Sequence, residues 1–174
     1  MHHTNSASSN NQKAPEQRLL KMWRRYGKTT VGRQLFSIIL GRTAPYSGSI
    51  GALVNHLEPG VAEVSLKDRK KLRNHLNSIH AIALANLGEL ASGLAMISAI
   101  PPETRAIVVD LKIKYIKKAR GQLFASGSAA PPEIITQPLD SVALAEIKDS
   151  EGDIVATVNV LWRLSPKQTQ DNNK

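Results

Sequence analysis

The chain has 174 residues, a net charge of +9 at neutral pH and no cysteine. This length suits one domain with a sizeable hydrophobic core. The lack of thiols excludes disulfides, a cysteine nucleophile and cysteine-bound zinc, and it is compatible with the cytoplasm. Aromatic residues make up only 4%, too few for a surface that binds nucleic acid by base stacking. We therefore expect a cytoplasmic protein with no nucleic-acid partner, whose positive charge attracts another anion or serves solubility.

The N-terminal part of the chain is polar and then basic. Residues 1–15 are rich in Ser, Asn and Gln and are predicted to be a disordered tail. Residues 16–40 follow a helical pattern that Gly27 and Gly32 are expected to divide into two pieces. Residues 1–40 hold seven Lys and Arg against a single acid, Glu16. This basic segment could contact a membrane surface or a polyanion. The interpretation that we favour is that its apolar stripe packs on the rest of the protein.

The body of the chain, residues 41–165, reads as two strands, one long helix and four further strands. Strands are expected at 50–57 and 61–67, and the helix at 79–99 with Asn77 or Ser78 as its N-cap. The last four strands are expected at 106–118, 121–129, 141–148 and 153–164, before a polar tail at 166–174. One long helix against an antiparallel sheet is an α+β architecture.

In the predicted strand at 106–118, apolar and charged residues alternate, as they do along a strand with one buried face. The alternation places Ile107, Val109, Leu111, Ile113 and Tyr115 on one face and Asp110, Lys112 and Lys114 on the other. We therefore expect Asp110 to form a salt bridge with a neighbouring lysine.

The predicted helix carries one charge between residues 81 and 99, at Glu89. At 3.6 residues per turn, the side of the helix that holds Glu89 is otherwise apolar or small (Ile82, Ala85, Gly93 and Met96). Taking an ionised carboxylate out of water costs about several kcal/mol, so Glu89 has either a structural partner, such as Asn74 or Asn86, or a chemical task. The helix is long enough to raise the question of a membrane span, but Glu89 and Asn86 near its middle argue against one. A helix that is apolar on nearly all sides must be wrapped by the sheet and by a second subunit.

The order of elements resembles the hotdog fold, in which an antiparallel sheet wraps around a long central helix; here the N-terminal helical segment would be an extension of it. Two motifs over residues 40–165 resemble hotdog thioesterases. The first is Asn74, then His80-Ala81, then an acid nine residues after the histidine, Glu89. The second is an aromatic residue followed closely by Ala119-Arg120-Gly121. Within the superfamily, the chain is similar to an uncharacterised thioesterase-like family (DUF4442) and to the phenylacetate-degradation type of acyl-CoA thioesterases.

The resemblance implies roles for four residues. Glu89 would be the base or nucleophile, Asn74 would hold the attacking water or the acyl group, the Ala81 N–H would polarise the thioester carbonyl, and His80 would organise the helix start. An apolar surrounding raises the pKa of a carboxylate toward neutral, and helix N-termini offer free N–H groups to an oxyanion. Glu89 lies about 13 Å beyond the helix start at ~1.5 Å per residue. In the related enzymes the acid and the oxyanion donor come from different subunits, so a homodimer or a dimer of dimers is expected.

Two further groups of residues concern the substrate. Active relatives usually have glycine where this chain has Ile82, so Ile82 could narrow or block the acyl pocket. The basic loop from Lys67 to Arg73 could attract the phosphates of coenzyme A, and so could a run of cations at the end of the predicted strand, Lys112, Lys114, Lys117, Lys118 and Arg120. The alternative is a solvated strand edge whose lysines discourage edge-to-edge pairing.

We therefore expect an acyl-CoA thioesterase that hydrolyses a fatty or related acyl thioester on coenzyme A or an acyl carrier. One alternative is a non-catalytic acyl-CoA binding protein in which Ile82 has closed the water site. A second is a membrane-associated protein that makes peripheral contact through residues 16–40. No metal is expected, because His56 and His75 have no metal-ligand spacing with an acid. No cofactor is expected either, apart from coenzyme A as part of the substrate.

Overall fold

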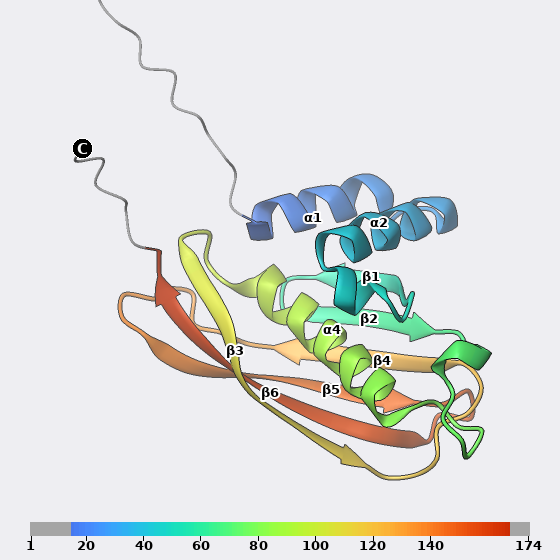
Figure 1. Ribbon diagram of the computed structural model, residues 1–174. Coiled ribbons are helices and arrows are strands. Elements are labelled where there is room, and N and C mark those ends of the chain that lie inside the picture. The colour runs from blue at the N-terminus through green and yellow to red at the C-terminus, as the bar shows by residue number, and fades with distance from the viewer. Residues whose placement is uncertain (1–14, 168–174) are drawn as a thin grey trace, which may run out of the picture.

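The computed structural model describes residues 15–167, so the predicted tails lie almost entirely outside the described residues. Six antiparallel strands form one sheet in the order β1-β2-β4-β5-β6-β3. Their bounds are β1 Leu53–Glu58, β2 Val61–Leu66, β3 Thr104–Tyr115, β4 Leu123–Ala129, β5 Leu139–Lys148 and β6 Ile154–Pro166. The sheet curves around the long helix α4, Ala81–Ala99 (Figure 1). This is the predicted hotdog fold of the α+β class.

Helix α4 lies close against the sheet because small residues stand at the points of contact. A Cβ on Gly88 would collide with the side chain of Val158 on β6, and a Cβ on Gly127 of β4 would collide with the carbonyl of Ala91. By length and composition α4 could cross a membrane, but 61% of its most apolar stretch is buried inside the fold. Packing within the sheet accounts for its apolar composition.

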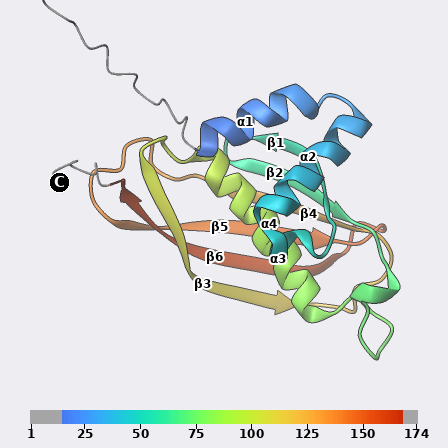
Figure 2. The same ribbon diagram turned by 45° about the horizontal axis from the view of Figure 1, so that its top comes forward.

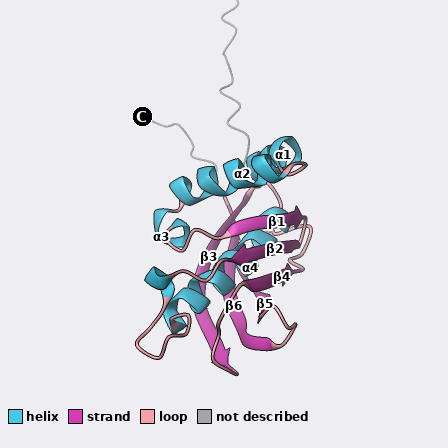
Figure 3. Ribbon diagram, turned by 90° about the vertical axis from the view of Figure 1, so that its right-hand side faces the viewer, coloured by secondary structure: helices cyan, strands magenta, loops and turns pink. Residues whose placement is uncertain are grey.

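Three helices precede the sheet: α1 Pro15–Tyr26, α2 Thr30–Thr43 and the short α3 Pro45–Gly48. Leu19 of α1 and Phe36 of α2 are buried in the main core. The Ser37 hydroxyl accepts a hydrogen bond from the Val54 N–H at 2.9 Å, so α2 covers the edge strand β1. Figures 2 and 3 show α1 and α2 beside β1, at the opposite edge of the sheet from β3. The apolar stripe of the basic segment therefore packs on the rest of the protein, which is the alternative that we favoured.

The helical segment is interrupted at Gly27, which follows the end of α1. The prediction that Gly32 also breaks the helix is wrong. Gly32 lies in the first turn of α2, and its N–H donates to the side chain of the N-cap residue Thr29 at 3.1 Å. Glycine is needed there for close packing, because a Cβ on Gly32 would collide with the carbonyl of Tyr26.

The predicted faces of β3 are also partly wrong. A bulge between Val108 and Asp110 shifts the register of β3 against β6, and a bulge reverses the side on which the following residues point. Val108 and Leu111 therefore both pack against the core. Ile107 and Val109, which simple alternation placed with Leu111, are 47% and 49% exposed.

Candidate active site

The loop that leads into α4 is held together by Asn74. Its Oδ1 accepts hydrogen bonds from the N–H of Leu76 at 2.9 Å, the N–H of Ser78 at 3.2 Å and the Ser78 hydroxyl at 3.2 Å. This turn brings the chain back on itself through Asn77, whose φ is +53°. Asparagine suits such a turn because its side chain can replace a backbone acceptor. Within residues 15–167 the Asn74 Nδ2 donates no hydrogen bond, so the amide nitrogen remains available to an oxygen of a ligand.

The helix begins later than predicted, at Ala81, with His80 as its N-cap. The His80 Nδ1 accepts a hydrogen bond from the Ile82 N–H at 3.1 Å. The prediction of Asn77 or Ser78 as N-cap is wrong because the residues after them are extended. The backbone N–H of Ile79 donates to the carbonyl of Ala119, and that of His80 donates to the carbonyl of Leu72, both at 2.8 Å.

The Ala81 N–H makes no hydrogen bond with any described residue. It lies in the first turn of α4, where N–H groups point out of the helix and the helix dipole is positive. The loop of Asn74, the cap of His80 and the free N–H of Ala81 thus come together at one end of the helix. An N–H group in this position can stabilise a developing oxyanion.

Glu89 lies in the middle of α4 and is half-buried. Removal from water raises the pKa of its carboxyl group. Neither of the two structural partners that were considered bonds to Glu89. Asn86 Nδ2 donates to the Tyr46 carbonyl at 3.2 Å, and Asn74, whose Oδ1 holds its own loop, makes no hydrogen bond with Glu89 in the described chain. The Glu89 carboxylate accepts no hydrogen bond within the described chain, so nothing in one protomer compensates its burial.

An indole ring of the sheet lies on the same side of α4 as the carboxylate. A Cβ at Gly93 would lie 3.8 Å from Glu89 Oε1 and 3.5 Å from Cζ2 of Trp162 on β6. The carboxylate and the ring edge therefore share the space beside Gly93. The Trp162 Nε1 is buried without a hydrogen-bond partner. This apolar wall explains why burial alone shifts the pKa of Glu89.

Glu89 and the helix start do not meet within one protomer. Ala81 and Glu89 are separated by eight residues of a continuous helix, which is about 12 Å along the axis. Ile82, nearly two helical turns before Glu89, has a side chain that is 55% exposed in the protomer. A single carbonyl group can reach either the Ala81 N–H or Glu89 of one chain, but not both.

The predicted phosphate-binding cations have different surroundings. Lys117 lies between Asp149 at 2.7 Å and Asp153 at 2.5 Å, and these carboxylates raise the pKa of its ammonium group. Arg120 Nε donates to the Asn77 carbonyl at 3.3 Å, which supports the loop before α4. Lys118 is exposed and has no partner in the described part of the chain. Of the three, only Lys117 is paired with carboxylates; Lys118 and Arg120 make no ion pair in the described part of the chain.

The cations on β3 were expected to pair with the strand's own acid. Lys112 lies 3.2 Å from Asp110, so the predicted salt bridge is confirmed. Both side chains are exposed, and such a pair contributes little to stability.

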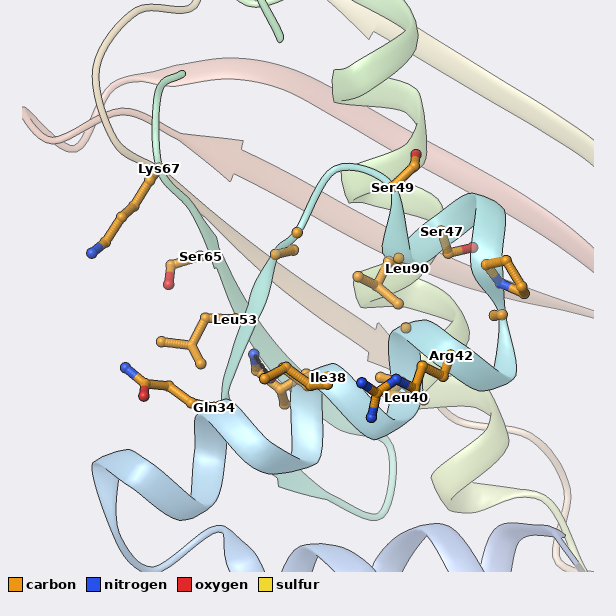
Figure 4. A pocket seen from close by; sticks show the side chains of 18 of the residues that line it. Gln34, Ile38, Leu40, Arg42, Ser47, Ser49, Leu53, Ser65, Lys67 and Leu90 are labelled. Carbon is orange, nitrogen blue, oxygen red and sulfur yellow. Dashed lines mark hydrogen bonds between the residues drawn. The ribbon is translucent and has the colours of Figure 1, made fainter. Parts of the chain in front are cut away.

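The sequence analysis missed a cavity of about 800 Å³. It lies between α2 and α3 on one side and β1 and β2 on the other, and it touches α4 only at Leu90 (Figure 4). Lys67 and Arg69, from the basic loop that was expected to attract phosphates, line it, whereas none of the predicted catalytic residues does. The sequence indicated only this basic part of the cavity, because the other walls come from segments that were read only as a helical extension and as strands.

Comparison with known proteins gives one family match and one curated relative. The sequence model of the family described as "Domain of unknown function (DUF4442)" matches residues 32–164. A curated protein of Halobacterium salinarum, named "Putative esterase VNG_1336C", is 33% identical over 84 residues, or 45% of this chain. The match spans 56% of that relative's length.

Solved structures show the same fold. The crystal structure of "genomics APC5556" is 29% identical, with a TM-score of 0.73 over 85% of this chain and 98% of that one. The thioesterase SAV0944 from Staphylococcus aureus is 17% identical, with a TM-score of 0.61 over 70% of this chain and 99% of that one. Because the family match runs from α2 to β6 and covers well over half of the sequence, this chain belongs to the family described as "Domain of unknown function (DUF4442)".

Proposed function

We propose that this protein is a hydrolase of acyl thioesters, carried by coenzyme A or an acyl carrier, in which Glu89 is the base or nucleophile. The observation that carries the proposal is a half-buried carboxylate with no hydrogen-bond partner in the described chain, on the central helix of a hotdog fold. The names of the relatives, an esterase and a thioesterase, support the same reaction class. A carboxylate whose pKa is raised by burial is a stronger base near neutral pH.

The spacing of the proposed groups agrees with the variants made in one relative. The Staphylococcus aureus thioesterase has been crystallised with alanine in place of a glutamine and with alanine in place of a glutamate fifteen residues later. The interval from Asn74 to Glu89 is also fifteen residues (89 minus 74). This agreement supports a shared task for the Asn74 amide and the Glu89 carboxylate.

The dimer that the mechanism needs has a suitable surface on β3. This strand ends the sheet, and within residues 15–167 no strand pairs with its outer edge. It is 12 residues long and exposes Ile107, Val109 and Tyr115. A long, unpaired edge with exposed apolar side chains among its charged ones can pair with another chain. We therefore propose a homodimer in which two copies pair along β3.

Such pairing would bring Glu89 near the helix start of the other subunit. The Tyr115 hydroxyl donates to the Ala81 carbonyl at 3.1 Å, so the start of α4 lies at the C-terminal end of β3. Antiparallel pairing of two β3 strands reverses the partner, and in a register that pairs the C-terminal halves of the two strands the partner's helix start would lie beside the middle of this helix. In this arrangement Ala81 of the partner subunit and Glu89 would face the same carbonyl group.

The chemical step follows from these positions. Glu89 takes a proton from a water that attacks the thioester carbonyl, and the side-chain amide of Asn74 of the partner subunit holds that water or the acyl oxygen. The oxyanion of the tetrahedral intermediate accepts a hydrogen bond from the N–H of Ala81 of the partner subunit. When the carbon–sulfur bond breaks, the thiolate receives the proton from Glu89. If Glu89 attacks directly instead, water hydrolyses the resulting anhydride in a second step.

The test is thiol release from a panel of acyl-CoA thioesters, with wild type compared with Glu89→Gln. Glu133→Gln is the matched control, because Glu133 is exposed in the loop between β4 and β5. We expect turnover of at least one thioester by wild type and by the control, and loss of at least a hundredfold in Glu89→Gln. Absence of turnover on every thioester by a folded wild type that still binds them would favour the acyl-CoA binding alternative.

A further inference from the structure

The cavity beside α2 has the size of a small-molecule site. Its volume of about 800 Å³ falls within the range of roughly 300–1,000 Å³ that is usual for ligand pockets. Figure 4 shows it between α2 and the first two strands, with Ile38, Leu53 and Leu90 among its side chains. Glu89 is not in its lining, because consecutive helix residues point about 100° apart. The cavity is therefore distinct from the space beside Gly93.

The interior surface is aliphatic. The apolar side chains come from α2, the β1 region and α4, and there is no aromatic residue among those that line the cavity. They are Ile38, Leu40, Leu53, Val54 and Leu90. A nucleobase or an aromatic acid would find no ring to stack on, whereas a flexible hydrocarbon chain needs only such aliphatic walls.

The margin of the cavity is positively charged. Arg42, Lys67 and Arg69 line it, and none of the three pairs with a carboxylate in the described part of the chain. Arg69 is instead fixed in place, since its Nη2 donates to the carbonyls of Ile50 and Gly51. No acidic residue lines the cavity. Lys67, Ser65 and Gln34 lie at one end of it, and Arg42 lies at the other, near α3 (Figure 4).

The segment that surrounds the cavity adds to the positive electrostatic potential at its margin. Residues 17–57 contain seven Lys and Arg and no Asp or Glu, so this segment alone carries +7 of the net +9. A cleft in such a segment concentrates anions and raises their rate of arrival.

We propose that this cavity binds an unbranched aliphatic chain that ends in an anionic group. Two ligands combine such a chain with an anion: a free fatty acid, through its carboxylate, and an acyl-CoA, whose thioester is uncharged and whose phosphates, beyond the pantetheine arm, would lie toward the cations. Binding of an acyl-CoA rests on the proposed function, whereas binding of a free fatty acid does not. Leu90, which follows Glu89 on α4, is where the chain would lie closest to the carboxylate.

The first test is calorimetric binding of decanoate, dodecanoate and tetradecanoate below their micelle concentrations. Affinity should rise about fourfold for each added methylene, as expected for burial of hydrocarbon. Ile38→Asp should weaken binding at least tenfold, because it puts a like charge into the aliphatic wall. Val31→Asp is the matched control and should change binding less than twofold, since Val31 is 75% exposed on the same helix and does not line the cavity. Affinity independent of chain length, or equal effects of the two substitutions, would overturn the proposal.

The cationic margin is tested with Lys67→Glu against Lys70→Glu, a lysine of the same loop that does not line the cavity. Binding of dodecanoate should weaken at least fivefold in the first variant only. A non-hydrolysable dodecyl-CoA thioether separates the two sources. If it displaces dodecanoate, the cavity accepts the acyl chain of a thioester; if it does not, the ligand is the free fatty acid.

Failure of the cavity proposal and failure of the proposed function give different results. Thioester hydrolysis with no chain-dependent binding of fatty acids would overturn the cavity proposal and leave the proposed function intact. Chain-dependent binding that Ile38→Asp abolishes, in a protein that hydrolyses no thioester, would support the cavity and contradict the proposed function.

Discussion

The Tyr115 hydroxyl, at the C-terminal end of β3, donates a hydrogen bond to the carbonyl of Ala81, the first residue of α4, at 3.1 Å. This bond joins the open edge of the sheet to the helix start that carries the free N–H. The surface on which a second subunit is proposed to pair is therefore fixed relative to the proposed oxyanion donor. The first prediction tests that link.

Tyr115→Phe should lower the free energy of unfolding by about 0.5–1 kcal/mol, since it removes one partly exposed hydrogen bond. It should lower kcat for thioester hydrolysis more than it raises KM, because the Ala81 N–H would be less well placed. Denaturant unfolding and steady-state kinetics measure both effects. Tyr46→Phe is the control, because Tyr46 is 72% exposed and its hydroxyl makes no hydrogen bond in the described chain. Equal kinetic effects of the two substitutions would contradict the role of this link.

The second prediction concerns pH and activity. Burial raises the pKa of Glu89. A base must be ionised, so kcat/KM should fall as the pH drops through this raised pKa, at a higher pH than for an ordinary carboxylate. A pH–rate profile of the wild type measures it. An acid limb at the ordinary glutamate pKa of 4.5 would show that the titrating group is not Glu89.

The raised pKa of Glu89 also makes the stability of the fold depend on pH. This dependence has the opposite sign from that of a salt-bridged carboxylate, whose pKa is lowered. The folded protein binds the Glu89 proton more tightly than the unfolded chain does, so this proton stabilises the fold at low pH. That stabilisation is lost as the pH rises from the ordinary value of 4.5 through the raised pKa. Glu89→Gln cannot titrate, and its stability relative to wild type should therefore increase across this window. A stability difference that stays constant with pH would contradict the unpaired burial of Glu89.

The third prediction tests the packing that positions α4. Gly88→Ala should destabilise the fold by about 1–3 kcal/mol, because the added methyl group collides with the Val158 side chain. Gly93→Ala on the same helix should be neutral or stabilising, since its methyl group would find ordinary contacts with Trp162 and Glu89 and alanine favours the helix by about 1 kcal/mol. Equal stability changes in denaturant unfolding would show that α4 does not lie against β6 as described.

The fourth prediction concerns Ile82, which the structure leaves 55% exposed at the helix start. If the side chain narrows the acyl site at the dimer interface, Ile82→Gly should raise kcat/KM for bulky acyl groups more than for acetyl-CoA. Thiol release from dodecanoyl-CoA and acetyl-CoA gives the ratio of the two kcat/KM values. A ratio unchanged from wild type would show that Ile82 lies away from the acyl group. Ile82→Ala is a useful companion, because it shortens the side chain without adding the flexibility of glycine.

The sequence was most informative where a charged residue stood in an otherwise apolar pattern. Glu89 is the single charge in a helix whose composition otherwise demands burial, and that conflict alone marked it for attention. The order of strands and helix was equally readable, because each strand is bounded by clear turn residues. The family resemblance then added roles for Asn74, His80 and Ala81 that periodicity could not supply.

The features that the sequence did not predict depend on contacts between distant segments. The bulge in β3 changes which residues face the core, and its cause lies in the register with β6 rather than in β3 alone. His80 caps the helix because Leu72 and Ala119 hold the two preceding residues extended. The cavity exists only because α2 lies over β1, which no local pattern of either segment encodes.

The fifth prediction, and the most direct test of the central claim, is complementation between two inactive variants. Ala81→Pro removes the proposed oxyanion donor at a helix position where proline is well tolerated, and His80 already has an extended backbone that suits a following proline. We expect Ala81→Pro to fold normally and to lose about 10²–10³ in kcat.

In a mixed dimer of Ala81→Pro with Glu89→Gln, one site would pair an intact Glu89 with an intact Ala81 from the other subunit. We predict that acyl-CoA hydrolysis reappears when the two inactive variants are unfolded and refolded together, and that each variant refolded alone stays inactive. No recovered activity in mixed dimers verified by size and composition would contradict a site shared between subunits, and activity of Ala81→Pro alone would contradict the Ala81 N–H as oxyanion donor.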